Sequence, residues 1–437
     1  MALAPANATS TDPSPILDDG QHIDAPELRL FVMALFFTFG GITSLNDVII
    51  PKLKELFTLN YMQAMLVQTA FFAAYAIVGI PGAALVKKVG YMRGAVIGLL
   101  AMMAGCLLFV PASRSAAFPI FLLALFVLAG GVTIVQVVSN PLISLLGPAR
   151  TAHSRLTFAQ AFNSLGTTVF PYVGAIVMLG GLAKVSAAQL SGAALDAYRV
   201  AETHAVVRAY LGLALALAVV AAVVWFNRHR LKGERHTEGP IVQSFGLLRR
   251  PRFGFGALCI FLYVGAEVAI GSLIVNYLRQ ADVMGLDERS AGQLIPLYWG
   301  GALIGRFIGS GVLRVVNPGG VLAFNALGAI ALILVSANSA GPISGYSLLA
   351  IGLMNSIMFP TIFSLASEGL GPRAADGSGV ICVAIVGGAI IPPLTGRLAD
   401  LTESLRLSLG LPALCYIVIA AFGVYGLRRR RPRQTVT

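Results

Sequence analysis

The sequence predicts an all-α membrane protein with twelve transmembrane helices, arranged as two bundles of six. Of its 437 residues 57% are hydrophobic, only 11% are charged, and apolar runs long enough to span a membrane recur along the chain. An ordinary soluble protein carries about 25% charged residues. Too few charged groups are present to cover the surface of a soluble domain of this size, so the composition excludes a soluble globular protein.

Twelve apolar runs reach the length of about 20 residues that crosses a hydrocarbon core. Inside a bilayer every backbone N–H and C=O needs a partner within its own segment or a close neighbour, so each run is expected to be a helix. Pro141 and Pro171 interrupt the fourth and fifth runs, which are therefore expected to be the least regular. The runs lie at 29–50, 62–86, 92–111, 118–146, 155–180, 204–226, 254–279, 290–314, 319–337, 343–367, 375–399 and 408–427.

Polar stretches divide these runs into domains. The first residues are acidic, contain no Lys or Arg and lack the features of a signal peptide, so they are expected to form a disordered cytoplasmic tail. The longest polar stretch between runs follows the sixth and separates six runs from six. The predicted parts are the tail at 1–27, a bundle at 28–226, a cytoplasmic loop at 227–253, a second bundle at 254–427 and a basic cytoplasmic tail at 428–437.

The two predicted bundles share a sequence pattern. Asn140-Pro141 in the fourth run corresponds to Phe359-Pro360 in the tenth, and each pair is followed by Ser-Leu and then Gly-Pro. Pro171 and Pro392 stand at a similar offset of about 220 residues. A repeat of six-helix halves is typical of secondary transporters. Chance coincidence of Pro and Gly in membrane helices is the alternative.

The basic residues indicate how the chain is oriented. If the N-terminus lies in the cytoplasm, that side of the membrane carries roughly twice as many Lys and Arg as the other, as the positive-inside rule requires. Both termini are therefore predicted to be cytoplasmic. The net charge of +12 flanks membrane spans and does not gather on one docking face, so we expect no binding to nucleic acid.

No motif of a soluble enzyme is present. The chain has no P-loop, no HExxH and no paired cysteine motif, its four cysteines lie in apolar runs, and its five histidines lie in loops or at span ends. The sequence therefore predicts a protein that is not an enzyme and that has no metal site and no cofactor.

Three ionisable residues fall inside predicted spans, where charge is costly and marks functional candidates. They are Asp47 in the first run, Glu267 near the middle of the seventh and Arg306 in the eighth. Desolvation disfavours the charged form of a carboxylate, so a buried carboxylate exchanges a proton near neutral pH, as proton coupling requires. The alternative to proton coupling is a structural role, in which Arg306 neutralises a neighbouring carboxylate. For Arg306 itself, a structural ion pair or a contact with carbonyl groups is favoured.

Uncharged polar residues also fall in the spans. Amides both donate and accept hydrogen bonds, as sugar hydroxyls do, and aromatic faces pack on the apolar side of a pyranose ring. The set therefore favours a polar binding site between the bundles, although Asn and Gln also hydrogen-bond between membrane helices without any ligand. The predicted substrate-binding residues are Asn46, Gln68, Gln136, Asn140, Gln160, Asn163, Asn276, Tyr298, Trp299 and Asn355.

Several sequence blocks resemble a known family. The stretch GAALVKKVGYMRG (82–94) is similar to a loose form of the loop between helices two and three of the major facilitator superfamily, without its usual acidic residue. More specific blocks resemble the fucose/glucose–galactose branch of that superfamily, the FucP-like sugar:proton symporters. These blocks are SLNDVIIP (44–51), VQVVSNP (135–141), SRLTFAQAFNSLGTT (154–168), YVGAEVAIGS (263–272), YWGGALIGRFIGS (298–310) and FPTIFSLA (359–366).

The resemblance implies roles for three residues. Asp47 matches the carboxylate of the first helix that the family links to proton coupling. Gln136 stands where fucose transporters have a glutamate, and Glu267 stands where they have a glutamine. This exchange is similar to glucose/galactose and N-acetylglucosamine transporters, so Glu267 is expected to be a second proton-coupling group or a sugar ligand.

The resemblance also implies the activity. We expect proton-coupled hexose uptake by alternating access, with glucose or galactose as substrate, and N-acetylglucosamine or fucose as alternatives. A metabolite or drug exporter of the same fold and a non-transporting membrane sensor are further alternatives. The expected partners are a small-molecule sugar, a proton and the lipid bilayer. The chain is expected to be a monomeric, multi-pass protein of the bacterial inner membrane.

Overall fold

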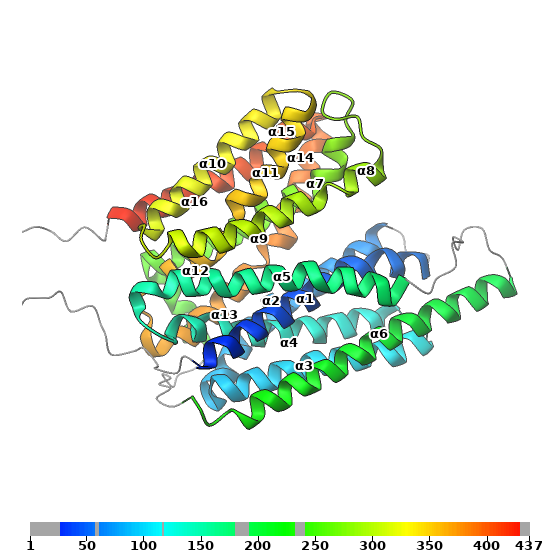
Figure 1. Ribbon diagram of the computed structural model, residues 1–437, viewed down its shortest axis with the longest axis horizontal. Coiled ribbons are helices and arrows are strands. Elements are labelled where there is room, and N and C mark those ends of the chain that lie inside the picture. Colours follow the sequence, from blue (N-terminus) through cyan, green and yellow to red (C-terminus); the bar gives the residue numbers. More distant parts are fainter. Residues whose placement is uncertain (1–26, 57–60, 116–117, 180–191, 232–240, 429–437) are drawn as a thin grey trace, which may run out of the picture.

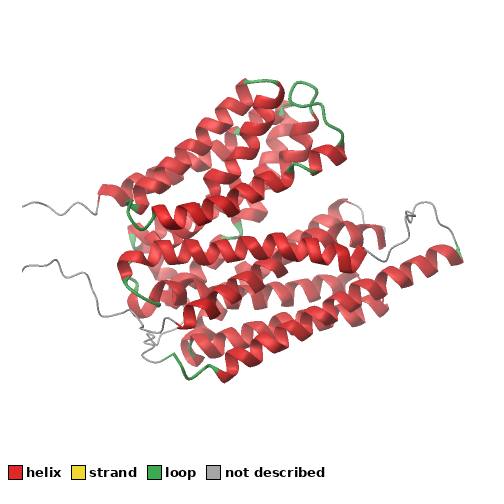
Figure 2. Ribbon diagram, viewed as in Figure 1, coloured by secondary structure: helices red, strands yellow, loops and turns green. Residues whose placement is uncertain are grey.

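The computed structural model describes residues 27–56, 61–115, 118–179, 192–231 and 241–428. Within these ranges all regular secondary structure is helical (Figures 1 and 2). The predicted tails lie outside the described residues, apart from the first residue of the first helix and the last residue of the last one.

The N-terminal half contains one helix for each of the first six predicted runs. Five of the six helices extend beyond their runs at one or both ends, because hydropathy marks the apolar centre of a helix and not its polar ends, whereas α4 ends one residue before its run does. The helices are α1 (Glu27–Leu56), α2 (Tyr61–Val89), α3 (Tyr91–Ser115), α4 (Phe118–Leu145), α5 (Ala152–Leu179) and α6 (Ala193–Phe226).

The C-terminal half also fills six predicted runs, but four of them contain two helices each. Between the halves, a 3₁₀ helix, η4 (Ile241–Arg249), occupies part of the predicted central loop. The helices of the second half are α7 (Pro251–Arg279), α8 (Glu288–Gly292), α9 (Ile295–Val312), α10 (Pro318–Asn338), α11 (Gly341–Asn355), α12 (Met358–Ser367), α13 (Ala374–Ala384), α14 (Gly387–Thr402), α15 (Leu405–Ser408) and α16 (Gly410–Arg428).

The prolines act differently from the sequence expectation. Helices α4 and α5 continue through Pro141 and Pro171, so these two spans are regular. The interruptions fall instead in the tenth span, between Asn355 and Met358, and in the eleventh, between Ala384 and Gly387. The interruption in the tenth span precedes Pro360, whereas α14 continues through Pro392 and Pro393, so a proline alone does not decide where a span is interrupted.

The two halves pack by the same plan. In the first half α1 packs on α5, α2 on α4, and α3 on both α4 and α6. In the second half α7 packs on α14, α9 on α11, and α10 on both α11 and α16. In each half the first span therefore packs on the fifth, the second on the fourth, and the third on the fourth and the sixth. The prediction of two pseudo-symmetric six-helix bundles is therefore confirmed.

Between the halves, α2 packs on α13 and α5 packs on α9. The first crossing is close: a Cβ atom on Gly379 would lie 2.7 Å from the backbone oxygen of Gly79 and 2.6 Å from Cβ of Ala83. The start of α1 and the end of α16 lie at the same end of the molecule as this crossing, and the two halves diverge toward the opposite end (Figure 1).

Nine helical segments among the described residues are long and apolar enough to cross a membrane, and Leu28–Ser44 of α1 forms a shorter apolar helix. The fifth and eighth predicted spans are helical but are not among the nine. Both carry polar groups within their length, which are Gln160 and Asn163 in α5 and Arg306 in α9. The chain is thus a multi-pass membrane protein.

Candidate functional site

A polar cluster lies inside the N-terminal half, where α4 and α5 meet. Gln136 and Asn140 lie one turn apart on α4, and both are buried. Gln136 Nε2 donates to the hydroxyl of Tyr75 on α2 at 2.9 Å, and Gln160 Nε2 donates to Asn140 Oδ1 at 3.4 Å. Asn140 Nδ2 is buried and has no hydrogen-bond partner among the described residues. The cluster therefore holds an amide donor that is free to bind a further polar group.

Asn163, also on α5, has a different partner. Its Nδ2 donates to the backbone oxygen of Phe36 on α1 at 3.4 Å, and its side chain is half-buried. The contact joins two helices, as membrane amides commonly do. The predicted residues Asn46 and Asp47 lie in α1 and Gln68 lies in α2, but the side chains of all three lie outside the described residues.

A second polar cluster surrounds Glu267 in the C-terminal half. Its Oε1 accepts a hydrogen bond from the hydroxyl of Tyr263, one turn earlier on α7, at 2.7 Å. Its backbone oxygen accepts one from the hydroxyl of Tyr298 on α9 at 3.2 Å. The carboxylate is half-buried. None of the ion pairs found among the described residues includes Glu267.

Asn355, fully buried at the end of α11, connects this cluster. Its Nδ2 donates to the Tyr298 hydroxyl at 2.8 Å, and its Oδ1 accepts from the Tyr416 hydroxyl of α16 at 2.7 Å. Its backbone oxygen accepts from the Tyr263 hydroxyl at 3.1 Å. Through its side-chain amide and its backbone oxygen, Asn355 thus joins α11 to α7, α9 and α16 of the same half.

The interruption between α11 and α12 has a local cause. Pro360 has no N–H, so it cannot bond the carbonyl of Ser356 four residues earlier, and its ring crowds that carbonyl. Side chains from three other helices bond the carbonyls of this segment. Met354 O accepts from Asn325 Nδ2 at 2.8 Å, Asn355 O from Tyr263, and Ser356 O from Arg306 Nε at 3.1 Å.

Arg306 joins the two halves. Its Nε donates to Ser356 O, in the interruption between α11 and α12 of its own half. Its Nη1 donates to Gln160 O of α5 at 3.0 Å and to the hydroxyl of Ser164, also on α5. Its side chain is 9% exposed. The sequence favoured an ion pair or a carbonyl contact for this residue, and the structure shows the carbonyl contact. A buried cation thus binds neutral acceptors on both sides of the interface between the halves.

Two predicted binding residues are not part of either cluster. Asn276 is exposed on α7, and no hydrogen bond joins it to a described residue. Trp299 is 41% exposed and packs edge-on against Tyr298, with ring centroids 5.0 Å apart.

The halves are also joined by charged groups at the end where α1 starts. Lys87 Nζ of α2 lies 2.7 Å from Asp376 Oδ1 of α13, and the hydroxyl of Ser244 in η4 donates to the same oxygen at 2.8 Å. His153 Nε2 of α5 lies 2.9 Å from an oxygen of Glu368, whose other oxygen binds Arg252. These contacts close one end of the interface between the halves.

The partners of the predicted site residues, above all Tyr75, Tyr263 and Tyr416, were not predicted from the sequence. A weak signal was present. A tyrosine inside a membrane span needs a partner for its hydroxyl, and Tyr263 precedes Glu267 by one helical turn. Tyr75 and Tyr416 contact their amide partners across 61 residues each, and no local pattern shows such contacts.

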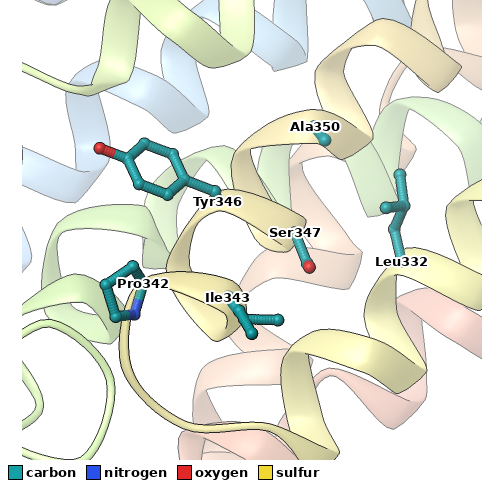
Figure 3. A pocket seen from close by; sticks show the side chains of 6 residues that line it. All are labelled: Leu332, Pro342, Ile343, Tyr346, Ser347 and Ala350. Carbon is teal, nitrogen blue, oxygen red and sulfur yellow. The ribbon is translucent and has the colours of Figure 1, made fainter.

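Two further features are not functional sites of the expected kind. In the described part of the chain no group of three His, Cys, Asp or Glu residues could hold a metal ion. A pocket of about 360 Å³ lies along α10 and α11 and contains neither a charged residue nor a predicted site residue (Figure 3). It is lined by Leu332, Pro342, Ile343, Tyr346, Ser347 and Ala350.

Comparison with known proteins gives consistent matches. The family model described as Major Facilitator Superfamily matches residues 31–391. The chain is 48% identical over 400 residues to the "Glucose/galactose transporter" of Brucella abortus, which covers 90% of this chain and 92% of that one. It is 32% identical to the "L-fucose-proton symporter" of Escherichia coli, over 91% of this chain and 94% of that one.

A solved structure agrees with the sequence matches. The fold superposes with a TM-score of 0.83 on the crystal structure of the transporter FucP in the outward conformation, at 30% sequence identity. The match covers 91% of this chain and 98% of that chain.

Proposed function

The chain belongs to the major facilitator superfamily and to its fucose/glucose–galactose branch, and on this premise we propose that it carries a hexose into the cell together with a proton. The two halves would expose a central site alternately to each side of the membrane. Glucose and galactose are the favoured hexoses because the Brucella abortus relative, 48% identical to this chain, is named for them. The family resemblance from sequence is confirmed, and the chain is a transporter and not an enzyme.

The observation that carries the proposal is Glu267, a carboxylate at the middle of a membrane helix that receives a hydrogen bond from Tyr263. It has no ion-pair partner within the described residues, so a change in its protonation is not prevented by a bound cation. We assign proton coupling to Glu267 together with Asp47. This assignment of Asp47 rests on the sequence blocks that surround it.

We assign hydroxyl recognition to the cluster of Gln136, Asn140 and Gln160. The amide nitrogen of Asn140 is buried without a partner among the described residues, and a buried donor without a partner costs about 1–3 kcal/mol. A sugar hydroxyl would remove that cost on binding. Asn355 uses its oxygen and its nitrogen within its own half, which supports a scaffold role.

The proposed state of the molecule is outward-facing, with both termini in the cytoplasm. The basic flanks of the spans support this orientation. The charged contacts of Lys87, Asp376, His153 and Glu368 then close the cytoplasmic end, and the halves diverge toward the outside. We further propose that the protein works as a monomer in the bacterial inner membrane, surrounded by lipid.

Uptake into proteoliposomes tests the proposal. An acidic exterior should drive labelled glucose above its equilibrium level, and a protonophore should abolish that accumulation. Unlabelled galactose should compete, and the order of competition by galactose, N-acetylglucosamine and fucose identifies the substrate. Sugar binding without any flux would indicate a sensor, and proton-driven export would indicate an exporter. Either result would contradict the proposal.

A further inference from the structure

The hydroxyl of Tyr263 lies between two acceptors. Glu267 Oε1 is 2.7 Å away on the same helix, and the backbone oxygen of Asn355 is 3.1 Å away, in the interruption between α11 and α12. Tyr263 is 1% exposed, so water does not compete for the hydroxyl. A phenol has a single proton to donate. The two acceptors therefore compete for one hydrogen bond.

The charge of Glu267 decides which acceptor is stronger. A hydrogen bond to an ionised carboxylate is about twice as strong as one between neutral groups. The hydroxyl of Tyr263 therefore donates its hydrogen bond to an ionised Glu267, and the Asn355 carbonyl is left with a weaker bond. A protonated Glu267 has an O–H to donate, so Tyr263 accepts from the carboxyl group and donates to Asn355.

The second acceptor lies in a segment whose carbonyls are bonded by side chains of other helices. Pro360 has no N–H to offer Ser356 O, and the carbonyls of Met354, Asn355 and Ser356 accept from Asn325, Tyr263 and Arg306. The next carbonyl after the one that Tyr263 bonds is Ser356 O, which accepts from Arg306. Arg306 also binds α5 of the other half. A change at Asn355 O thus occurs one residue away from the contact between the halves.

Building on the proposed role of Glu267 in proton coupling, we propose that Tyr263 is the positioning residue that transmits the protonation of Glu267 to the interruption between α11 and α12. With Glu267 ionised, the hydroxyl bonds the carboxylate. With Glu267 protonated, the hydroxyl bonds Asn355 O and stabilises the interruption. Protonation at one helix is thereby linked to the shape of another helix and, through Arg306, to the contact between the halves.

Other ionisable groups face Glu267 as well, and none replaces Tyr263 in this role. Tyr298 and Arg306 face it from α9, and Tyr416 faces it from α16. On α13, the ionisable groups Cys382 and Asp376 interact with Tyr75 and Lys87 of α2. Among these groups only Tyr263 donates a hydrogen bond both to the carboxylate and to the interruption.

The test compares Tyr263→Phe with a matched control, Tyr277→Phe. Both residues are buried on α7, and both changes remove one hydroxyl. Tyr277 lies about three helical turns from Glu267 on α7, and its hydroxyl donates to Ser336 O of α10 at 2.9 Å. Ser336 also bonds Ser344 of α11, so α10 and α11 stay joined when the Tyr277 hydroxyl is removed. The measurement is exchange of labelled glucose in proteoliposomes, with equal sugar and equal pH on both sides, from mildly acidic to mildly alkaline pH.

We expect wild-type exchange to be faster at acidic pH. In Tyr263→Phe the ratio of acidic to alkaline exchange rates should fall by about two- to tenfold, the effect of one hydrogen bond. Equilibrium sugar binding should stay near that of the wild type. Tyr277→Phe should keep the wild-type ratio. An unchanged ratio in Tyr263→Phe overturns the inference, whereas a wild-type protein without sugar transport contradicts the proposed function instead.

A second pair of variants makes the test independent of the folding of one protein. In Glu267→Gln the side chain at this position is neutral at every pH, so exchange should lose the part of its pH dependence that comes from Glu267. Adding Tyr263→Phe to that background should lower exchange by the same two- to tenfold factor at every pH. A double variant that exchanges sugar as fast as Glu267→Gln would also overturn the inference.

Discussion

Lys87 of α2 and Asp376 of α13 form a buried ion pair between the two halves, with Nζ and Oδ1 2.7 Å apart and side chains 8% and 4% exposed. The lysine comes from the loop that resembles the superfamily's helix two–three motif, and this chain lacks the motif's acidic residue. In this chain the basic residue lies on the N-terminal half and the acidic one on the C-terminal half. The pair closes the interface at the end where α1 starts and α16 ends.

Removing one member of this pair should destabilise the closed end. In Asp376→Asn a buried lysine loses its counter-charge, and such losses cost about 3–5 kcal/mol. We expect a lower unfolding temperature in detergent, measured by tryptophan fluorescence. The double variant Lys87→Met/Asp376→Leu should recover most of the loss, because neither charge is then left buried alone. Equal instability in the single and double variants would contradict the pairing.

The close crossing of α2 and α13 should not tolerate a larger residue. In Gly379→Ala the added Cβ would lie 2.7 Å from Gly79 O, so the two helices must separate. We expect slower sugar exchange and a lower unfolding temperature. Gly396→Ala in α14 is the control, because its Cβ meets no heavy atom within 4 Å and alanine favours a helix. Identical behaviour of the two variants would show that the crossing is not close.

Neutralising Glu267 should separate transport from its driving force. In Glu267→Gln the side chain keeps its shape but cannot exchange a proton. We expect loss of uphill accumulation, while exchange of sugar between the two sides continues. Proton-driven accumulation in proteoliposomes measures the first and counterflow the second. If accumulation is unchanged, Glu267 has no coupling role.

Asp47→Asn should have a similar effect. The prediction rests on the sequence, in which Asp47 is one of two acidic residues deep in the predicted spans. We expect uphill uptake to be lost and exchange of bound sugar to be partly retained. Survival of uphill uptake in this variant would refute a coupling role for Asp47.

Replacing Arg306 should weaken the contact between the halves. Arg306→Met removes the donor to Ser356 O and to Gln160 O, and a buried acceptor without its donor costs about 1–3 kcal/mol. We expect lower stability and slower exchange. Arg314→Met is the control, because Arg314 is exposed and its hydrogen bond to the other half goes to the hydroxyl of Ser154 at 3.3 Å. An equal loss in both variants would contradict the role of Arg306.

Much of the fold could be predicted from the sequence. Each of the twelve predicted runs is helical, because the length and polarity of a membrane helix are properties of its own residues. The interruptions could not be predicted in the same way. Pro141 and Pro360 occupy matching positions in the two halves, yet α4 is continuous and the tenth span is broken. The difference lies in Arg306, Tyr263 and their acceptors, which come from other helices.

The candidate site could be predicted only in part. Glu267 and Arg306 stood out because charge is rare in the spans, and Gln136, Asn140 and Gln160 because they share helix faces. The partners of these residues could not be identified from the sequence, since Tyr75 is 61 residues from Gln136 and Gln160 is 146 residues from Arg306. Asn276 and Trp299 have the same chemistry as the residues of the clusters but are exposed.

The sequence by itself determined that the chain spans a membrane, that its helices form two related halves, and that few acidic residues could exchange a proton within the spans. These properties follow from burial and charge, which each segment carries along its own length. Only the tertiary structure decided which hydroxyl contacts Glu267, which carbonyls Arg306 bonds, and which end of the interface is closed. Those contacts depend on how helices from distant parts of the chain pack, and each hydrogen bond requires two atoms to lie within a few tenths of an ångström of their proper distance.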